Sequence, residues 1–290
     1  MKGIIASNCN PNNNPHTKVG ACAMFEGTPS GLIFTHKDGL FSTEKEAFNL
    51  ELADGVYAPG INRVIPVSSG IVALGLNGGD LKTSQEGFGP ESPVGLNALR
   101  EDYTITAGGI CLYKQLTKLD KRQVRLFKVD QTQIAYGTVA TIGGEDKMRG
   151  YLVTVGVSRR INTGEASGAI ILSLFYDANF QNEDINGNSI PLTETIEGLT
   201  GIILRKGSAA GKASVIVACS GDDLTATYGT EFAEATLYEQ EDGTNPTTVT
   251  YLSGELTIAP AGKYKIVDAL TLKGVGIEGY EGEEEYVNIA

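Results

Sequence analysis

Residues 102–119 read Asp102-Tyr-Thr-Ile-Thr-Ala-Gly-Gly-Ile-Cys-Leu-Tyr-Lys-Gln-Leu-Thr-Lys-Leu119. The alternation of polar and apolar residues predicts a strand, which runs through a glycine pair into a short amphipathic helix with leucines on one face. Two more strands are predicted at 124–129 and 134–139, where apolar and polar residues alternate as on a half-buried sheet. The segment therefore predicts a mainly β protein with a short helix beside its sheet.

The flanking sequence before this segment continues the pattern. Strands are predicted at 31–36, 64–67 and 71–76. A helix is predicted at 42–52, with Ser42 as its cap, Gly55 ending it, and Ala47, Leu50 and Phe48 facing inward. Residues 77–93 hold so many Gly, Pro, Ser and acidic residues that they predict a long loop, and a loop of this length usually makes a functional contact.

The sequence after the segment divides into two parts. Strands are predicted at 151–158 and 168–176, followed by a polar loop at 177–189. A second series of short strands with turn signals between them resembles a small sandwich. Its members are residues 200–205, 213–219, 234–238, 247–251, 255–258 and 263–267, with Pro260–Gly262 as the turn before the last.

These patterns predict two domains with a boundary near residue 199. The first, 1–199, is expected to be a β domain with one or two short flanking helices and an N-terminal arm at 7–16, which is rich in Asn and Pro. The second, 200–290, is expected to be a β-sandwich that folds alone and ends in an acidic tail that is solvated or docks on a basic surface.

The composition excludes several classes of protein. No apolar run approaches the roughly 18 to 20 residues that cross a bilayer, and the N-terminal apolar stretch is too short for a signal peptide. We therefore expect the chain to remain in the cytosol where it is made. Its four cysteines, Cys9, Cys22, Cys111 and Cys219, are far apart, which is typical of isolated thiols in a reducing compartment. We expect them to be free, with Cys111 and Cys219 buried.

The net charge of −12 is unevenly distributed. Residues 1–160 hold 17 Lys and Arg against 15 Asp and Glu, whereas residues 161–290 hold 6 against 20, so the two parts carry +2 and −14. Basic residues concentrate between 114 and 128, and they predict a contact with an acidic surface of another copy. The candidate subunit-interface residues are Lys114, Lys118, Lys121, Arg122 and Arg125.

A nucleic-acid interface is the alternative interpretation of this basic segment. Lys114, Lys118 and Lys121 recur at helical spacing opposite Leu112, Leu116 and Leu119. A DNA-binding domain is usually basic as a whole, but this chain has a pI near 4.7. We therefore favour an ordinary amphipathic helix, or one that docks on an acidic neighbour.

Two loop motifs resemble ligand sites but depart from them. Residues 182–188 imitate the start of a calcium loop, yet the twelfth position is Thr193 where a bidentate Glu is needed. Residues 207–213 resemble a phosphate-binding loop but are one residue short and place Ala213 where Ser or Thr binds magnesium. An Asx-rich turn and a hairpin turn explain the two segments better.

Catalytic and metal-binding residues are not predicted. Cys9, His16 and Cys22 lack the close ligand pair typical of zinc sites. His16 and His36 are the only histidines, and neither has a sequence context that indicates acid–base chemistry. The adjacent carboxylates at 222–223 and 283–285 are typical of a solvated face. We expect no enzyme activity, no cofactor and no metal.

The central segment resembles a recurring pattern in structural proteins of tailed bacteriophages that infect gut bacteria. The matching residues are Tyr103-Thr-Ile-Thr, Gly108-Gly-Ile-Cys-Leu-Tyr-Lys-Gln-Leu116, Lys118-Leu119, Arg125-Leu-Phe127 and Tyr136-Gly-Thr138. The resemblance is closest to major tail proteins, also called tail tube proteins, and extends loosely over residues 1–190. It implies a β-sandwich core with a flanking helix, stacked hexameric rings, and a C-terminal immunoglobulin-like domain.

The resemblance also implies a location and partners. The chain would belong to the virion, be made in the cytoplasm of the bacterial host, and contact copies of itself and other tail or capsid proteins. Genomic DNA would pass through the ring without specific binding, and no membrane would be involved. Two alternatives remain open: a capsid decoration or head-fibre protein, and a glycan-binding adhesin module, although the lack of Trp weakens the adhesin interpretation.

Overall fold

The computed structural model describes residues 27–68, 70–85, 87–163, 167–180, 183 and 186–289. The fold is mainly β, with 46% strand and 17% helix, as the sequence predicts. The chain divides into two compact units: unit 1 holds Met1–Gly55 and Gly60–Ile196, and unit 2 holds Val56–Pro59 and Glu197–Ala290. The division at 196/197 lies close to the boundary predicted near residue 199.

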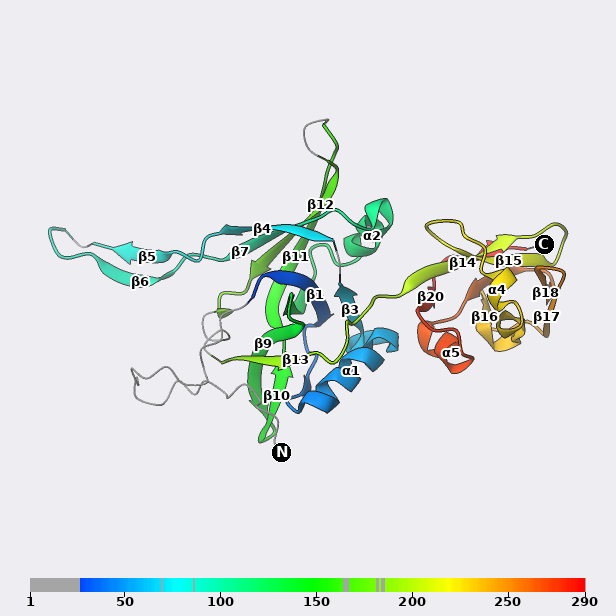
Figure 1. The fold of residues 1–290 in the computed structure, drawn as a ribbon, viewed down its shortest axis with the longest axis horizontal. Coiled ribbons are helices and arrows are strands. Elements are labelled where there is room, and N and C mark those ends of the chain that lie inside the picture. Colours follow the sequence, from blue (N-terminus) through cyan, green and yellow to red (C-terminus); the bar gives the residue numbers. More distant parts are fainter. Residues whose placement is uncertain are drawn as a thin grey trace. The chain divides into compact units, whose positions relative to one another are not determined.

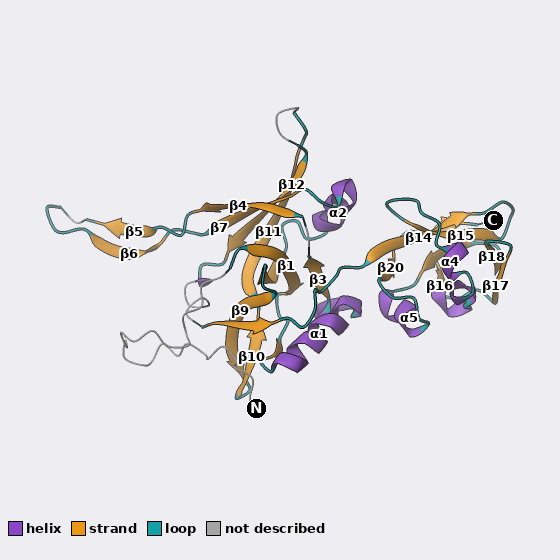
Figure 2. Ribbon diagram, viewed as in Figure 1, coloured by secondary structure: helices purple, strands orange, loops and turns teal. Residues whose placement is uncertain are grey.

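Unit 1 is built around one large sheet (Figures 1 and 2). The described strands follow the order β2-β10-β9-β8-β11-β12-β7-β4, with β1 paired to β3 and β8, and β13 paired to β9. Their bounds are β1 Pro29–His36, β2 Phe41–Ser42, β3 Val64–Val67, β4 Ile71–Asn77, β7 Arg100–Ile105, β8 Gln123–Asp130, β9 Ile134–Ile142, β10 Glu145–Arg149, β11 Tyr151–Arg160, β12 Ala169–Tyr176 and β13 Gly187–Pro191. Strand β13 lies partly in the segment 177–189 that the sequence predicts as a loop.

Strand β8 is the centre of unit 1 because both of its faces are covered. Val124 and Leu126 join one apolar core with residues of β1, β7, β11, β12 and the segment around Leu119. Phe127 points to the opposite face, where its ring meets Phe41 and Phe48, each with centroids 5.5 Å from it. Since successive side chains of a strand alternate between faces, β8 contributes to two apolar layers.

Helix α1 (Lys45–Tyr57) covers the Phe127 face. It begins and ends later than predicted: Ser42 belongs to β2, and the helix continues through Gly55. Phe48 and Leu52 are fully buried, whereas Leu50 is 63% exposed, so the prediction that Leu50 faces inward is wrong. The four-residue spacing from Phe48 to Leu52 puts both on one helix face and leaves Leu50 on the other.

Helix α2 (Gly109–Thr117) is the amphipathic helix that the sequence predicts. Gly108 and Gly109 both have positive φ, which explains why a glycine pair joins β7 to the helix. Leu116 and Leu119 enter the core of unit 1, and Leu112 packs against it. Lys114 and Lys118 are exposed.

The predicted loop at 77–93 is instead a two-stranded arm. Strands β5 (Leu81–Ser84) and β6 (Ser92–Leu96) pair antiparallel and project from unit 1 beyond β4 and β7 (Figure 1). The sequence interpretation was misled by the many turn-forming residues in this segment, because only those between β5 and β6 form the turn of the hairpin. Glycines at 78 and 79 adopt positive φ where the arm leaves the sheet.

Unit 2 has a five-stranded sheet, β17-β18-β15-β14-β20, and a three-stranded sheet, β16-β19-β21, among the described residues. The bounds are β14 Thr200–Lys206, β15 Lys212–Val217, α4 Thr225–Tyr228, β16 Tyr238–Gln240, β17 Thr248–Leu252, β18 Glu255–Ala259, β19 Lys263–Ile266, α5 Ala269–Gly274, β20 Tyr280–Gly282 and β21 Val287–Asn288. The short 3-10 helices among the described residues are Gly60–Asn62, Glu231–Ala233 and Ala235–Leu237. The strand predicted at 234–238 is therefore mostly a 3-10 turn.

The architecture of unit 2 leaves the immunoglobulin-like prediction open. Immunoglobulin-like sandwiches consist of antiparallel sheets, but β14 and β20 pair in parallel. Strands β20 and β21 also come from the acidic tail, which was expected to be solvated or docked. Only part of the tail remains exposed, at Glu278, Glu284, Glu285 and Asn288.

The cysteine predictions are wrong for the two described cysteines. Cys111 and Cys219 are both disulfide-bonded. Cys111 is half-buried and Cys219 is exposed, so neither is a buried free thiol. Cys9 and Cys22 lie outside the described residues, as does the predicted N-terminal arm. None of the described helices has the length and apolar character that a membrane crossing needs.

Candidate assembly surfaces

The arm exposes apolar side chains along its whole length. On β4, Leu74 and Leu76 point to one face because they alternate along the strand, and Val72, at the register shift between Ile71 and Ala73, is exposed as well. The exposed large apolar residues of β4 and the arm are Val72, Leu74, Leu76, Leu81, Phe88, Val94 and Leu96. A contiguous apolar surface of this kind usually marks an interaction site.

Backbone pairing adds to this surface. Strand β4 ends the order of the large sheet, and it pairs with β7 on one side. Leu81 and Leu96 lie opposite each other across β5 and β6. An exposed apolar edge is a template for association with another chain, so strand β4 together with the arm is the first candidate assembly surface.

The predicted interface residues separate into two groups. Lys114, Lys118, Lys121 and Arg122 are exposed on helix α2 and the turns that follow it. Lys121 has a φ of 59°, so it lies in a left-handed turn beyond the end of the helix. These four side chains lie where a partner can reach them.

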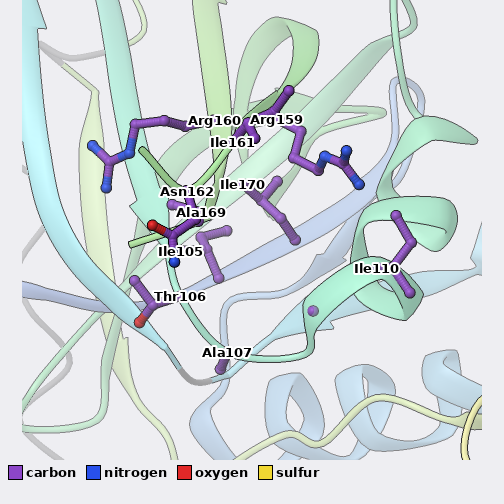
Figure 3. Close-up of a pocket in the computed structure, with 12 residues that line it drawn as sticks. Ile105, Thr106, Ala107, Ile110, Arg159, Arg160, Ile161, Asn162, Ala169 and Ile170 are labelled. Carbon is purple, nitrogen blue, oxygen red and sulfur yellow. The ribbon is translucent and has the colours of Figure 1, made fainter. Parts of the chain in front are cut away.

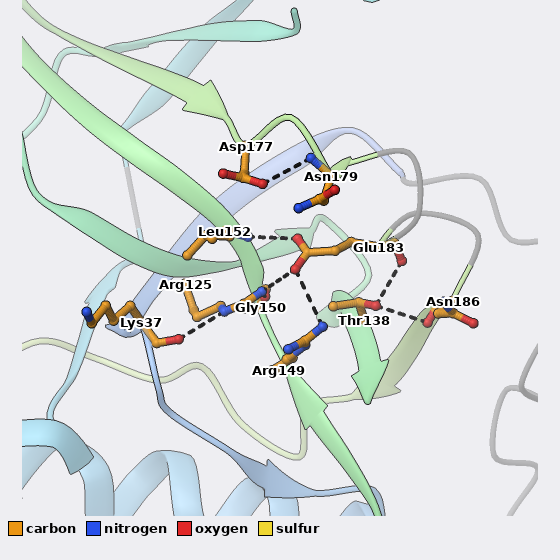
Figure 4. A network of polar contacts seen from close by, with 10 residues as sticks. All are labelled: Lys37, Arg125, Thr138, Arg149, Gly150, Leu152, Asp177, Asn179, Glu183 and Asn186. Atoms are coloured by element: carbon orange, nitrogen blue, oxygen red, sulfur yellow. Dashed lines mark hydrogen bonds and ion pairs between the residues drawn. The ribbon is translucent and has the colours of Figure 1, made fainter. Parts of the chain in front are cut away.

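Arg125 does not lie on the surface. It is buried on β8, and its Nη1 donates to Glu183 Oε1 at 2.5 Å and to the Gly150 carbonyl at 3.1 Å (Figure 4). Its Nε donates to the Lys37 carbonyl at 3.1 Å. Arg149 also approaches Glu183, at 3.6 Å. Arg125 is therefore not an exposed interface residue as predicted, and it has a structural role inside unit 1.

A second buried ion pair lies further along β8. Lys128 Nζ donates to Glu101 Oε1 at 2.8 Å, and both side chains are 5% exposed. The hydroxyls of Tyr103 and Tyr176 donate to Glu101 Oε2 at 2.8 and 2.7 Å. The carboxylate is thus satisfied on both oxygens, as a buried charge requires. Lys128, which belongs to the basic segment in the sequence, is also removed from the surface.

The exposed Arg122 belongs to a basic pocket of about 490 Å³. The pocket is formed by the end of β1, the residues leading into β3, and the link between α2 and β8. Its basic residues are His36, Lys37, Arg63 and Arg122, and its apolar lining includes Ile65, Leu119 and Val124. No aspartate or glutamate is among the described residues that line it. This basic pocket is the second candidate assembly surface.

A smaller pocket of about 270 Å³ lies at the start of α2 and has two arginines beside it (Figure 3). Arg159 and Arg160 are neighbours on β11, and their guanidinium groups point to opposite sides. Strand alternation explains this divergence. The two charges therefore do not converge on one anion.

The remaining motifs occupy ordinary positions. Residues 207–213 connect β14 to β15, so the phosphate-loop resemblance is a hairpin connection as predicted. Much of the calcium-like loop, and all three of Cys9, His16 and Cys22, lie outside the described residues. Among the residues that are described, no cluster of three or more His, Cys, Asp or Glu is arranged to hold a metal ion.

The arm and most of the basic pocket were missed from the sequence. The exposed apolar residues at 72, 74 and 76 lie in the strand predicted at 71–76, and the alternation at 94 and 96 could have indicated a further strand directly after the predicted loop. Lys37 and Arg63 had no local signal, since tertiary pairing of β1 with β3 and β8 brings them to Arg122. No protein-family model and no curated protein sequence matches this chain.

Proposed function

We propose that this chain is a self-assembling structural protein of a phage virion, and specifically a tail tube subunit that forms stacked rings through which DNA passes. The observation that carries the proposal is the arm, because no described residue of the same chain covers its exposed apolar side chains and contact with another copy would bury them. The resemblance over residues 103–138 supports the tail tube in particular. The role needs no catalysis and no cofactor.

The arm fits repeated association better than a single contact. It projects from one end of unit 1 (Figure 1), so a copy that receives an arm can also extend its own. Such head-to-tail contacts generate rings when the rotation closes and filaments when it does not. A stacked tube combines closed rings with open-ended growth along its axis.

Electron microscopy of the purified full-length chain tests the proposal. Rings or tubes are the expected result. Discrete trimers would instead favour the capsid decoration or head-fibre alternative, and monomers with glycan affinity would favour the adhesin. Either of these results would overturn the tail tube assignment.

A shortened arm tests whether the arm causes assembly. Gly79 N–H donates to the Asn97 carbonyl, and Asn97 N–H donates to the Asp80 carbonyl. Replacing residues 81–96 with Asn-Gly should therefore close the same ladder with a two-residue hairpin turn. We expect a folded monomer. Leu50→Ser on helix α1 is the control, since it removes an equally exposed leucine outside the arm.

A further inference from the structure

We propose that the basic pocket of one copy receives the tip of the arm of the next copy, with Phe88 as the anchor. The inference rests on the proposed function, because it names the surface to which the self-assembly arm binds. It identifies the partner as a second copy of this chain.

The tip of the arm presents an aromatic ring with no cover. Phe88 is fully exposed in the turn between β5 and β6. Exposed aromatic residues that fill a pocket on a partner contribute most to many interfaces. Phe88 therefore has the chemistry of an anchor residue.

The arm that carries this ring is acidic. Residues 80–96 contain Asp80, Glu86 and Glu91 against one basic residue, Lys82. The Thr83 hydroxyl donates to the Glu91 carboxylate, which fixes this charge across the two strands of the arm. The tip thus offers an apolar ring with a carboxylate held nearby.

The basic pocket has the complementary chemistry. Ile65, Leu119 and Val124 supply apolar walls for a ring, and Lys37 and Arg122 are exposed at its margin. Its volume of about 490 Å³ is ample for an aromatic side chain. Complementary charge between tip and pocket also orients the contact and disfavours other partners.

The positions of tip and pocket make the contact intermolecular. In Figure 1 the arm extends from one side of unit 1, while β3 and α2, which flank the pocket, lie on the opposite side. A tip therefore cannot reach the pocket of its own unit. Contact between unlike surfaces of successive copies is the head-to-tail kind that propagates.

A complementation experiment tests this pairing. The tip variant is Phe88→Ser, and the pocket variant is Lys37→Glu with Arg122→Glu. Each should associate at least about 30-fold more weakly than the wild type, the effect of losing an interface anchor. Mixing them should restore one intact tip and one intact pocket per pair, and mass photometry should show a 1:1 heterodimer.

A matched control makes the same two basic-to-acidic substitutions at a site outside the basic pocket. Arg159→Glu with Arg160→Glu alters two exposed arginines beside the other pocket (Figure 3), and this variant should assemble as the wild type does. Circular dichroism and the melting curve should be unchanged in all variants, since the altered side chains are exposed. A photo-crosslinker at position 88 should label peptides from 34–37 or 119–124 of a second copy.

The outcomes separate this inference from the proposed function. If the wild type forms rings or tubes and the pocket variant does so equally well, the pairing is wrong while the proposed function stands. Crosslinks confined to other segments, or no heterodimer in the mixture, also overturn it. Loss of affinity for inorganic phosphate or DNA in the pocket variant, with normal assembly, would assign the pocket to anions instead. A wild type that stays monomeric at every concentration overturns both.

Discussion

Strand β8 and the arm distribute their side chains in opposite ways. Strand β8 buries two positive charges, Arg125 and Lys128, whereas the arm exposes leucines, valines and a phenylalanine. Burial of an ion pair rarely adds net stability, but removing one partner is costly. Exposure of apolar surface adds nothing to the stability of a single copy. The contrast indicates that β8 specifies the fold of one subunit and that the arm serves contacts between subunits.

The largest effect should come from breaking the buried pair on β8. Lys128→Met leaves Glu101 buried with its two tyrosine donors but without its positive partner. We expect unit 1 to lose about 3–5 kcal/mol of unfolding free energy, measured by urea denaturation. The double variant Lys128→Met with Glu101→Leu should recover part of this loss. A single variant as stable as the wild type would contradict the contrast.

Asp130, at the end of β8, should show the next largest effect. Burial alone would raise the pKa of Asp130, but hydrogen bonds from the Ile134 N–H, from Thr132 and from Tyr136 hold it below its ordinary value. A lowered pKa means that the stabilisation is present above the unfolded-state pKa and is lost as the pH falls through the folded-state value.

We therefore expect Asp130→Asn to destabilise unit 1 by about 2 kcal/mol at pH 7, the scale of hydrogen bonds to a charged group. The difference from the wild type should shrink as the pH falls below about 4, near the ordinary pKa of Asp. Urea denaturation at several pH values measures it. Asp38→Asn, at an exposed site, is the control. A loss that is constant down to pH 3 would exclude the ionised carboxylate as its source.

The difference between β8 and the arm also explains how far the sequence predicted the structure. Strand β8 was predicted because its apolar residues alternate, and α2 because its leucines recur at helical spacing. The burial of Arg125 and Lys128 could not be predicted, since their partners Glu183 and Glu101 lie 58 and 27 residues away in the chain. Only the pairing of strands reveals that these basic residues are internal.

The candidate site was predicted only in part for a similar reason. Lys114, Lys118, Lys121 and Arg122 lie close together in the sequence, and the helix pattern predicted the exposure of Lys114 and Lys118. Lys121 and Arg122 lie beyond the end of the helix, where the predicted helical spacing does not hold. The pocket around Arg122 depends on β1 and β3, which are remote in the sequence. The arm was mistaken for a loop because Gly, Pro and polar residues together dominate its composition, and only Val94 and Leu96 on β6 alternate as apolar residues of a strand do.

Substitutions on the arm should leave the stability of a single copy almost unchanged. Leu81 and Leu96 face each other across the two strands and are already exposed. Leu81→Ser with Leu96→Ser should change the unfolding free energy by no more than about 0.5 kcal/mol, yet reduce assembly in sedimentation velocity. Leu252→Ser, an exposed position in unit 2, serves as the control. A large loss of stability would show that the arm supports the subunit itself.

The smallest effect should come from the exposed lysines of the basic segment. Lys114, Lys118 and Lys121 are exposed and lie outside the lining of the basic pocket, so they act on an acidic neighbouring copy only through partly screened charge. Such interactions decay over about 8–10 Å at physiological salt.

Reversing all three lysines to Glu should weaken assembly at low salt and have little effect at high salt, as measured by light scattering across a salt series. The wild type should also assemble less readily as salt rises, and its acidic rings should show negligible DNA affinity by gel shift. If neither salt nor the charge reversal changed assembly, the electrostatic contribution would be restricted to the residues of the basic pocket. Measurable DNA affinity would contradict a channel that repels the DNA passing through it.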